Sequence, residues 1–353
     1  MLRKQGKIIL TLLLAGAVAL AALTAGCGGS SATKGGKPKF VNGKLDKPFN
    51  LKVPTMSGFN EIYIGEKLGF YKEVGLNIDY TGSMTGSMLA QSVIKGDNHL
   101  FGTGHVLTIA KAREGGAKLK MVLQGSFDDP DPRKTHMTYL VKEDSPIKEA
   151  KDLIGKKVSI GYVGSCAELL FSEYLRQNGI KRDQVEWVVM ADNQAENALR
   201  QGNIDVAGIH NVFTLSAMKR GGVRPLVNTW AIGTAAGNGP ASSYSTRAFS
   251  EDFIKENPDI VKAYIAATVK TQHWINKNYD EAIQIAADYL KIDKDKAGGT
   301  RFPDDNAIDP VKVNFWIKMM EDNGFVKPQT VKIDEVCTNA LNPYLSGEIK
   351  ESG

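Results

Sequence analysis

The chain has 353 residues, of which 42% are hydrophobic and 24% charged, with a formal net charge of +5, three cysteines and five histidines. Three of the cations, Arg3, Lys4 and Lys7, lie at the extreme N-terminus, so the rest of the chain is near neutral, at about +2. No later segment combines clustered Lys and Arg with aromatic residues, which argues against nucleic-acid binding. The length favours two lobes of ordinary domain size over one small core.

The N-terminus has the pattern of a secretory signal. Cations precede an apolar run at residues 8–23, and the sequence Leu-Thr-Ala-Gly-Cys ends at Cys27. A membrane-spanning helix is the alternative, but the run is at the short limit of the roughly 20 residues that a span needs. The segment resembles the lipobox of bacterial lipoproteins, although Thr24 stands where leucine is commonest. The resemblance implies that Cys27 is lipidated, with residues 28–47 as a flexible tether.

Predicted strands and helices alternate through the next segment. Strand patterns at residues 49–53, 76–80, 100–103 and 119–124 enclose helix patterns at 60–68, 87–95 and 106–114. Ser87 is the predicted cap of the second helix and Gly96 its end. Gly69 and Gly75 interrupt the helical period just before a strand, which predicts a tight helix-to-strand reversal. The alternation favours a mostly parallel sheet flanked by helices.

The same alternation then starts again. After an extended segment at 136–142, a short helix is predicted from Ser145 and Pro146 to Gly155. Strand patterns follow at residues 158–161, 185–189, 204–210 and 224–227, with helix patterns at 166–177, 193–201 and 212–219. Residues 242–247 are predicted to be extended, and the chain from 253 onward consists of amphipathic helices whose apolar stripes we interpret as core.

The segments 136–142 and 242–247 are interpreted as two crossings between lobes. The predicted fold class is therefore α/β, with one lobe inserted in the other, each lobe a mostly parallel sheet flanked by helices, and a ligand cleft between them. The predicted boundaries are a signal at 1–27, a tether at 28–47, a discontinuous outer lobe at 48–138 and 244–353, and an inserted inner lobe at 139–243.

Five motifs in order resemble the solute-binding proteins of nitrate-, sulfonate- and taurine-type ABC importers, a group that also includes thiamine-precursor binders. The motifs are GEKLGFYKEVGLNIDY (65–80), SVIKGDNHLFGTG (92–104), GGAKLKMVLQ (115–124), SPIKEAKDLIGKKVSIGYVGS (145–165) and ALRQGNIDVAGIH (198–210). The resemblance spans residues 49–279. It implies a type II periplasmic binding protein fold, a small-molecule ligand, an ABC permease and ATPase as partners, and no enzymatic activity and no cofactor. It further implies a monomer outside the cytoplasmic membrane, held there by the lipid anchor.

In open α/β sheets, ligands bind beyond the carboxyl ends of strands, where helix N-termini offer N–H groups to anions. Ser87 and Ser165 could equally be ordinary helix caps, and Phe59, His105 and His210 could be structural. The segment 164–166 is the strongest candidate, because it starts the first helix of the inner lobe. The predicted ligand-binding residues are Ser57, Phe59, Asn60, Thr85, Gly86, Ser87, Thr103, Gly104, His105, Gly164, Ser165, Cys166, His210 and Asn211.

Hydroxyl-rich helix N-termini favour a small sulfonate, nitrate or carboxylate. No arginine lies in the candidate loops, and the one nearest a crossing is Arg133, although a doubly charged anion would want such a partner. An aromatic heterocycle, such as a thiamine-precursor pyrimidine, held by Phe59, Tyr162 and Trp230 is the alternative ligand.

A secreted enzyme of the same fold is a second alternative, with a catalytic group among His105, His210 and Asp192. The pyrimidine synthases that this fold resembles carry a dense cysteine cluster, which is absent here. Cys166 and Cys337 lie far apart in sequence, with no Cys-x-x-Cys and no cluster of histidines, so the sequence predicts no metal site. A disulfide between these two cysteines would tie together lobes that we expect to move.

Overall fold

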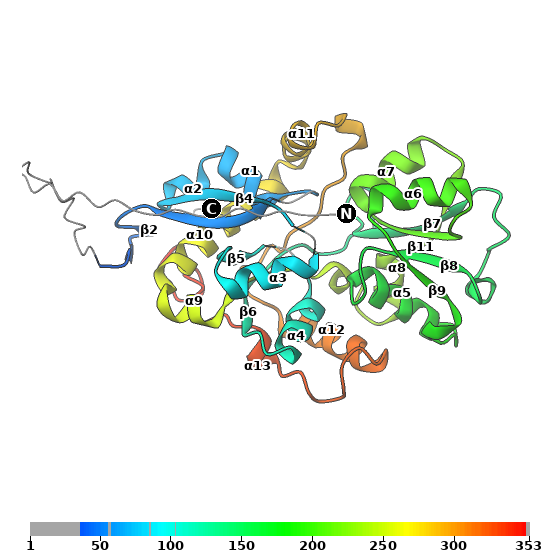
Figure 1. Cartoon of the computed structure of the whole chain (residues 1–353). Helices are drawn as coiled ribbons and strands as arrows, with labels where there is room; N and C mark the ends of the chain where they lie inside the picture. The colour runs from blue at the N-terminus through cyan, green and yellow to red at the C-terminus, as the bar shows by residue number, and fades with distance from the viewer. Residues whose placement is uncertain (1–35, 56–57, 85, 103, 351–353) are drawn as a thin grey trace, which may run out of the picture. The chain divides into compact units, whose positions relative to one another are not determined.

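The computed structural model describes residues 36–55, 58–84, 86–102 and 104–350. Cys27 and the candidate residues Ser57, Thr85 and Thr103 lie outside the described residues, so what was predicted for them stays a prediction. Within the described part, the strands form one five-stranded sheet, one three-stranded sheet and two separate pairs (Figure 1).

The first pairs lie in the N-terminal part of the described chain. A short antiparallel pair is formed by β1 (Phe40–Val41) and β2 (Lys44–Leu45), and a parallel pair by β3 (Phe49–Thr55) and β4 (Leu76–Ser83). Helices α1 (Glu61–Lys67) and α2 (Phe70–Glu73) connect β3 to β4. Gly69 and Gly75 have φ of +82° and +83°, a left-handed conformation that glycine adopts without strain, which confirms the predicted reversal.

The three-stranded sheet joins segments that are distant in sequence. β12 (Thr246–Ser250) lies between β5 (Leu100–Phe101) and β6 (Leu119–Gln124) and runs antiparallel to both. Helix α3 (Gly86–Lys95) precedes β5, and helix α4 (Val106–Glu114) connects β5 to β6. The later helices are α9 (Glu251–Glu256), α10 (Pro258–Lys277), α11 (Tyr279–Leu290), α12 (Pro310–Asp322) and α13 (Ile333–Val336). The 20-residue α10 buries its apolar stripe against β3, β6 and β12, as the amphipathic pattern predicted.

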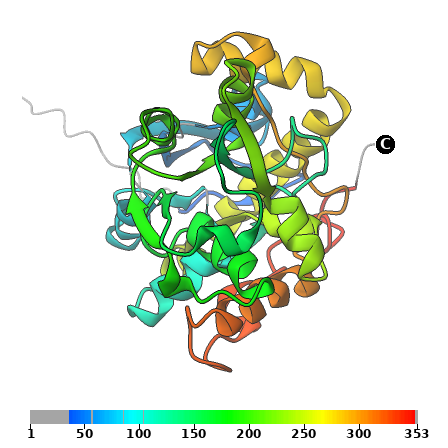
Figure 2. The same ribbon diagram turned by 90° about the vertical axis from the view of Figure 1, so that its right-hand side faces the viewer.

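The five-stranded sheet and its helices occupy residues 137–235 (Figures 1 and 2, green). Its strand order is β11-β7-β10-β8-β9, and β7 is antiparallel to both of its neighbours while the other pairs are parallel. The strands are β7 (Met137–Lys142), β8 (Lys157–Ile160), β9 (Glu186–Val189), β10 (Val206–His210) and β11 (Val223–Asn228), and the helices are α5 (Cys166–Gln177), α6 (Asp192–Gln201), α7 (Asn211–Lys219) and α8 (Thr229–Ala235). Two buried clusters pack the sheet against α5 and α8 and against α6 and α7.

One apolar core is shared between the two larger sheets. It contains Phe101, Met121 and Ala248 from the three-stranded sheet, side chains of the first half of α5, and Trp316 of α12. At the C-terminal end of α12, the Nδ2 of its C-cap residue Asn323 donates to Glu173 Oε2 of α5 at 2.8 Å. The two sheets are thus joined by apolar packing as well as by the chain crossings.

The prediction of a mostly parallel sheet in each lobe is wrong for the three-stranded sheet, because its central strand β12 comes from a later segment and runs antiparallel to both neighbours. Three local predictions are also wrong. The helix expected at Ser145 is a turn followed by a 3-10 turn at Ala150–Leu153, because the Asp152 carboxylate accepts the backbone N–H groups of Lys148 and Glu149 and so fixes a later start. Helix α3 begins at Gly86, so Ser87 lies within it and is not its cap. The predicted strand at 242–247 begins only at Thr246, after a 3-10 turn at Pro240–Ser243.

Helix α8 was not predicted. It begins where the Asn228 side chain accepts the Ala231 N–H at 2.9 Å, a cap that follows directly on β11. Among the described residues, no helix combines the length and apolar character that crossing a membrane requires.

Candidate functional site

A cavity of about 400 Å³ lies beyond the C-terminal ends of β3, β8 and β10. Seven of the predicted ligand-binding residues line it: Phe59, Gly104, His105, Ser165, Cys166, His210 and Asn211. Gly164 and Asn60 are not among the lining residues. The Asn60 Oδ1 instead caps α1 by accepting the Ile62 and Tyr63 N–H groups, at 3.0 and 3.2 Å. Gly86 and Ser87 form the start of α3, and their role in ligand binding stays a prediction.

Three helices begin at this cavity. Their N-cap residues are His105 for α4, Ser165 for α5 and His210 for α7. The Ser165 hydroxyl accepts the Glu168 N–H at 3.3 Å, which leaves the N–H groups of Cys166 and Ala167 without an acceptor inside the helix. Free N–H groups and the positive end of the helix dipole favour an anion at such positions.

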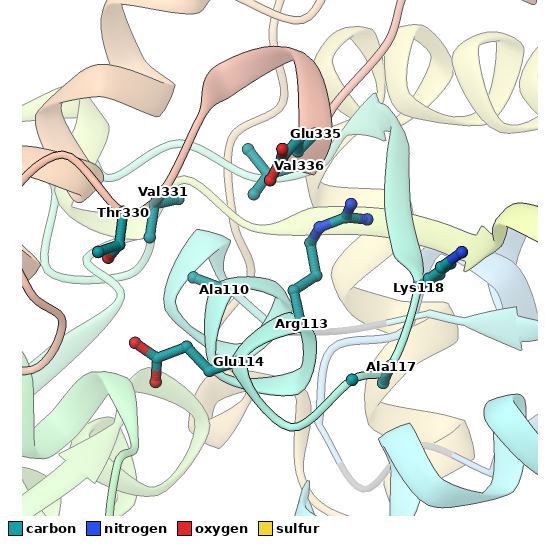
Figure 3. A pocket seen from close by; sticks show the side chains of 10 residues that line it. Ala110, Arg113, Glu114, Ala117, Lys118, Thr330, Val331, Glu335 and Val336 are labelled. Atoms are coloured by element: carbon teal, nitrogen blue, oxygen red, sulfur yellow. The ribbon is translucent and has the colours of Figure 1, made fainter.

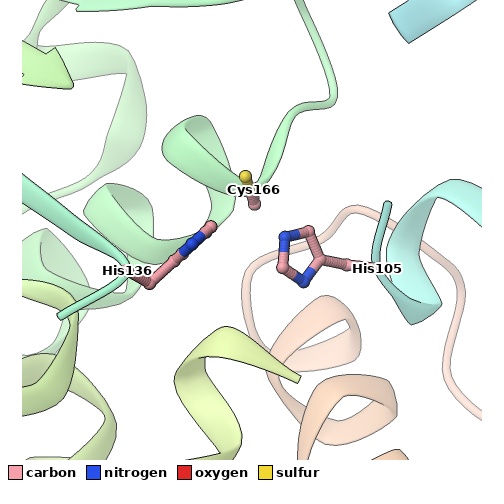
Figure 4. A group of neighbouring side chains, drawn as sticks. All are labelled: His105, His136 and Cys166. Carbon is pink, nitrogen blue, oxygen red and sulfur yellow. The ribbon is translucent and has the colours of Figure 1, made fainter. Parts of the chain in front are cut away.

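Three histidines and a cysteine surround one point of the cavity wall. Donor atoms of His105, His136 and Cys166 all lie within 4.8 Å of one another (Figure 4). The His105 ring centroid is 5.1 Å from that of His136, which is in turn 5.0 Å from that of His210. The His210 Nε2 is 3.9 Å from the Cys166 Sγ. The sequence analysis named His105, Cys166 and His210 as candidates but not His136, and it did not predict that the four would meet, because they come from four separate segments.

Hydrogen bonds hold two of the three imidazoles, those of His105 and His210. The His105 Nδ1–H donates to the Tyr244 carbonyl oxygen at 3.2 Å, since a carbonyl can only accept, and the ring stacks on Trp316 with centroids 4.6 Å apart. The His210 Nδ1 lies 2.5 Å from Asp192 Oδ2, and the His210 backbone N–H donates to the same oxygen at 3.0 Å. The His136 Nε2 is buried and has no hydrogen-bond partner within the described ranges.

The same contacts shift the pKa values of the cluster. Burial works to raise the pKa of the Cys166 thiol, but His105, His136 and His210 together hold it well below its usual value. Burial works to lower the pKa of His210, but the Asp192 carboxylate raises it well above the usual value. Burial lowers the pKa of His136 below its usual value.

A buried ion pair forms another part of the wall. The Arg247 Nε and Nη2 donate to the two Glu61 oxygens at 2.7 and 2.5 Å, and its Nη1 donates to the Thr246 carbonyl at 2.8 Å. Arg247 is the one Lys or Arg among the described lining residues, and the sequence analysis missed it. Arg133 instead pairs with Asp131 at 2.8 Å and does not line the cavity.

The aromatic residues proposed for a flat ligand do not meet. Phe59 and Tyr162 line the cavity, but Trp230 does not. Trp230 lies on α8 against Gly239, where a Cβ added to that glycine would come within 3.3 Å of the indole. The lining residues that carry a hydroxyl are Thr55, Ser83, Ser126, Tyr162, Ser165, Ser245 and Thr300, and of these only Ser165 was among the predicted ligand-binding residues.

A second, smaller cavity of about 250 Å³ lies between α4 and the segment around α13 (Figure 3). Its Arg113 donates to Glu251 at 2.8 Å and to the Leu119 carbonyl, so its charge is already paired. The partly exposed Cys337 lies nearby in sequence, and both Cys166 and Cys337 are free thiols.

Comparison with known proteins gives one family and several structures of the same fold. The family model described as NMT1/THI5 like matches residues 57–282. A protein of Escherichia coli strain K12, with the provisional name of an aliphatic sulfonates-binding protein, is 33% identical over 141 residues, which are 40% of this chain and 42% of that protein. The match thus covers less than half the length of that relative.

Two solved structures illustrate the fold. The periplasmic aliphatic sulphonate binding protein SsuA from Escherichia coli superposes with a TM-score of 0.64 at 22% identity, covering 82% of this chain and 92% of that one. The periplasmic nitrate-binding protein NrtA from Synechocystis PCC 6803 gives a TM-score of 0.68 at 12% identity, covering 89% and 90%. These likenesses show that the chain has the two-lobed type II periplasmic binding protein fold that the sequence analysis predicted.

Proposed function

This chain belongs to the NMT1/THI5-like family, and on that premise we propose that it is the solute-binding component of an ABC importer for a small organic anion. The sulfonate-binding and nitrate-binding relatives support an anionic solute. The observation that carries the proposal is the start of α4, α5 and α7 at one cavity, where the free Cys166 and Ala167 N–H groups of α5 can bind an oxyanion.

The charges at the cavity favour an anion of low charge. Arg247 already donates from Nε and Nη2 to Glu61 and from Nη1 to the Thr246 carbonyl, so it cannot also form a two-point contact with the solute. The hydroxyls of Ser126, Ser165, Ser245 and Thr300 can add neutral hydrogen bonds. A monovalent sulfonate or carboxylate suits such a lining better than a dianion does.

The cavity gives less support to the aromatic alternative. A flat heterocycle would be held between two rings, and of the three aromatic residues considered for this role Trp230 does not line the cavity. An enzyme of the same fold stays the second alternative, because Cys166 lies beside three imidazoles.

The proposal includes a place and partners for the chain. The secretory signal supports an extracytoplasmic monomer, and the lipobox-like segment supports a lipid anchor at Cys27 that keeps it beside the permease and ATPase of its importer.

A stability screen tests the solute class. A solute at a hundredfold excess over its Kd should stabilise the protein by about 2.7 kcal/mol. We expect stabilisation by one of the alkanesulfonates, taurine, nitrate or short carboxylates, followed by a 1:1 calorimetric titration. Stabilisation by a pyrimidine alone would replace the anion with an aromatic solute. Turnover of a stabilising compound would identify an enzyme instead.

A further inference from the structure

The cluster of His105, His136 and Cys166 has the composition of a transition-metal site. We propose that these three side chains bind a divalent metal ion of the zinc class, with one coordination position open to the cavity. This inference rests on the side-chain geometry alone, so it holds or fails separately from the proposed solute-binding function.

The spacing of the donor atoms is close to what zinc requires. With Zn–S near 2.3 Å and Zn–N near 2.0–2.1 Å, tetrahedral coordination places neighbouring donor atoms about 3.3–3.6 Å apart. The donor atoms of the three residues lie within 4.8 Å of one another, so small side-chain rotations would complete the site. In Figure 4 the three side chains converge from separate parts of the fold: His105 just before α4, His136 just before β7 and Cys166 at the first residue of α5.

The hydrogen bonds around the cluster leave the right atoms available. The His105 Nδ1–H is used by the Tyr244 carbonyl, so Nε2 keeps its lone pair. Metal-binding histidines are commonly oriented by such a bond to a carbonyl or carboxylate. The His136 Nε2 is buried and has no hydrogen-bond partner in the described part of the chain. A bound metal ion would be a partner for this nitrogen.

His210 and Asp192 serve as a supporting pair. Asp192 binds the His210 Nδ1, and the opposite nitrogen, Nε2, lies 3.9 Å from the Cys166 Sγ. A hydrogen bond from that nitrogen to the metal-bound sulfur would position the thiolate without replacing it as a ligand. We therefore assign His210 as a positioning residue of the metal site.

The donor set selects among metals. A thiolate with two imidazoles suits Zn²⁺ or a neighbouring first-row ion, whereas Mg²⁺ and Ca²⁺ prefer oxygen donors. Asp192, the nearby lining carboxylate, is already occupied by His210. The open position faces the cavity into which α5 directs free N–H groups, so an anion could complete the coordination.

Metal titration of protein purified with Cys27→Ala tests the site. Stripped protein is titrated with Zn²⁺ against a chromophoric chelator, and with Co²⁺ to observe thiolate coordination in the absorption spectrum. We expect 1:1 binding, a loss of roughly 100-fold or more in affinity for Cys166→Ser, His105→Gln and His136→Gln, and a loss of about 10-fold for His210→Gln. The matched controls Cys337→Ser and His99→Gln, which lie outside the cluster, should bind Zn²⁺ like the parent.

A chemical readout keeps the test independent of variant folding. In the Cys337→Ser background, Zn²⁺ should slow iodoacetamide alkylation of Cys166, because a coordinated thiolate is shielded. Alkylation that is rapid and unaffected by Zn²⁺, or Zn²⁺ binding that survives both Cys166→Ser and His136→Gln, would overturn the proposal. Solute titrations with and without Zn²⁺ separate the two hypotheses. Solute binding without any Zn²⁺ site refutes only the metal site, and Zn²⁺ binding without any solute refutes only the transport function.

Discussion

Replacing Glu61 with glutamine should destabilise the protein strongly, because it leaves the Arg247 guanidinium buried without its counter-ion. The two side chains are 2% and 8% exposed and share two hydrogen bonds. Burial works to lower the pKa of Arg247, but Glu61 raises it above the usual value, so the guanidinium stays charged. Arginine cannot shed this charge when the partner is lost.

The expected loss for Glu61→Gln is about 3–5 kcal/mol in the free energy of unfolding, the usual cost of breaking a buried ion pair from one side. Urea is the suitable denaturant, since it does not screen charge. With an m-value of about 3 kcal/mol/M, this loss moves the unfolding midpoint by roughly 1 M or more. The double variant Glu61→Gln with Arg247→Met should recover most of the loss, because no uncompensated charge remains.

The matched control is Glu73→Gln, which breaks the surface pair with Lys270, whose side chains are 54% and 49% exposed. Such pairs contribute about 0–1 kcal/mol, so this variant should unfold near the parent midpoint. If Glu61→Gln costs no more than Glu73→Gln, or if the double variant is no more stable than Glu61→Gln alone, the reasoning about the buried charge is refuted.

Ser165→Gly, which keeps most of the capping ability, should weaken solute binding by about 0.5–1.5 kcal/mol if the hydroxyl contacts the solute, and calorimetry showing parent-like affinity would remove Ser165 from the site. For Glu196, burial works to raise the pKa, but Arg220 and Arg200 lower it below its usual value, so its stabilisation is present above the unfolded pKa of about 4.3 and is lost as the pH falls through the folded pKa. Urea midpoints between pH 6 and 3 should thus fall less for Glu196→Gln than for the parent, and equal slopes would contradict this. Cys27→Ala should abolish lipid labelling and release the protein from membranes, whereas a variant that is processed and still membrane-bound would exclude the anchor. Saturating solute should lower the radius of gyration in small-angle scattering, and an unchanged value with a confirmed solute would argue against closure of the lobes.

Features set by neighbouring residues could be predicted from the sequence, whereas the meeting of His105, His136, Cys166 and His210 could not. The reversal at Gly69 and Gly75 and the helix that starts at Cys166 depend on local conformational preferences, and the structure has both. The short helix expected at Ser145 failed because Asp152, seven residues away, captures the backbone groups instead.

The cluster of His105, His136 and Cys166 depends on long-range packing. His136 lies 30 residues before Cys166 in the sequence, and the two meet only because β7 runs antiparallel to β10 and α5 begins beside it. The pairing of Glu61 with Arg247 spans 186 residues and joins α1 to β12. No spacing rule along the chain signals such contacts, so the sequence analysis missed Arg247.

The apolar core that α5 shares with the three-stranded sheet and α12 has a thermodynamic consequence. Any movement that separates the two larger sheets would expose side chains such as Leu169 and Trp316 to water, and exposure of apolar surface raises the heat capacity. The enthalpy of that opening therefore depends on temperature. A solute-binding protein built this way would have its open and closed populations set by temperature as well as by solute concentration.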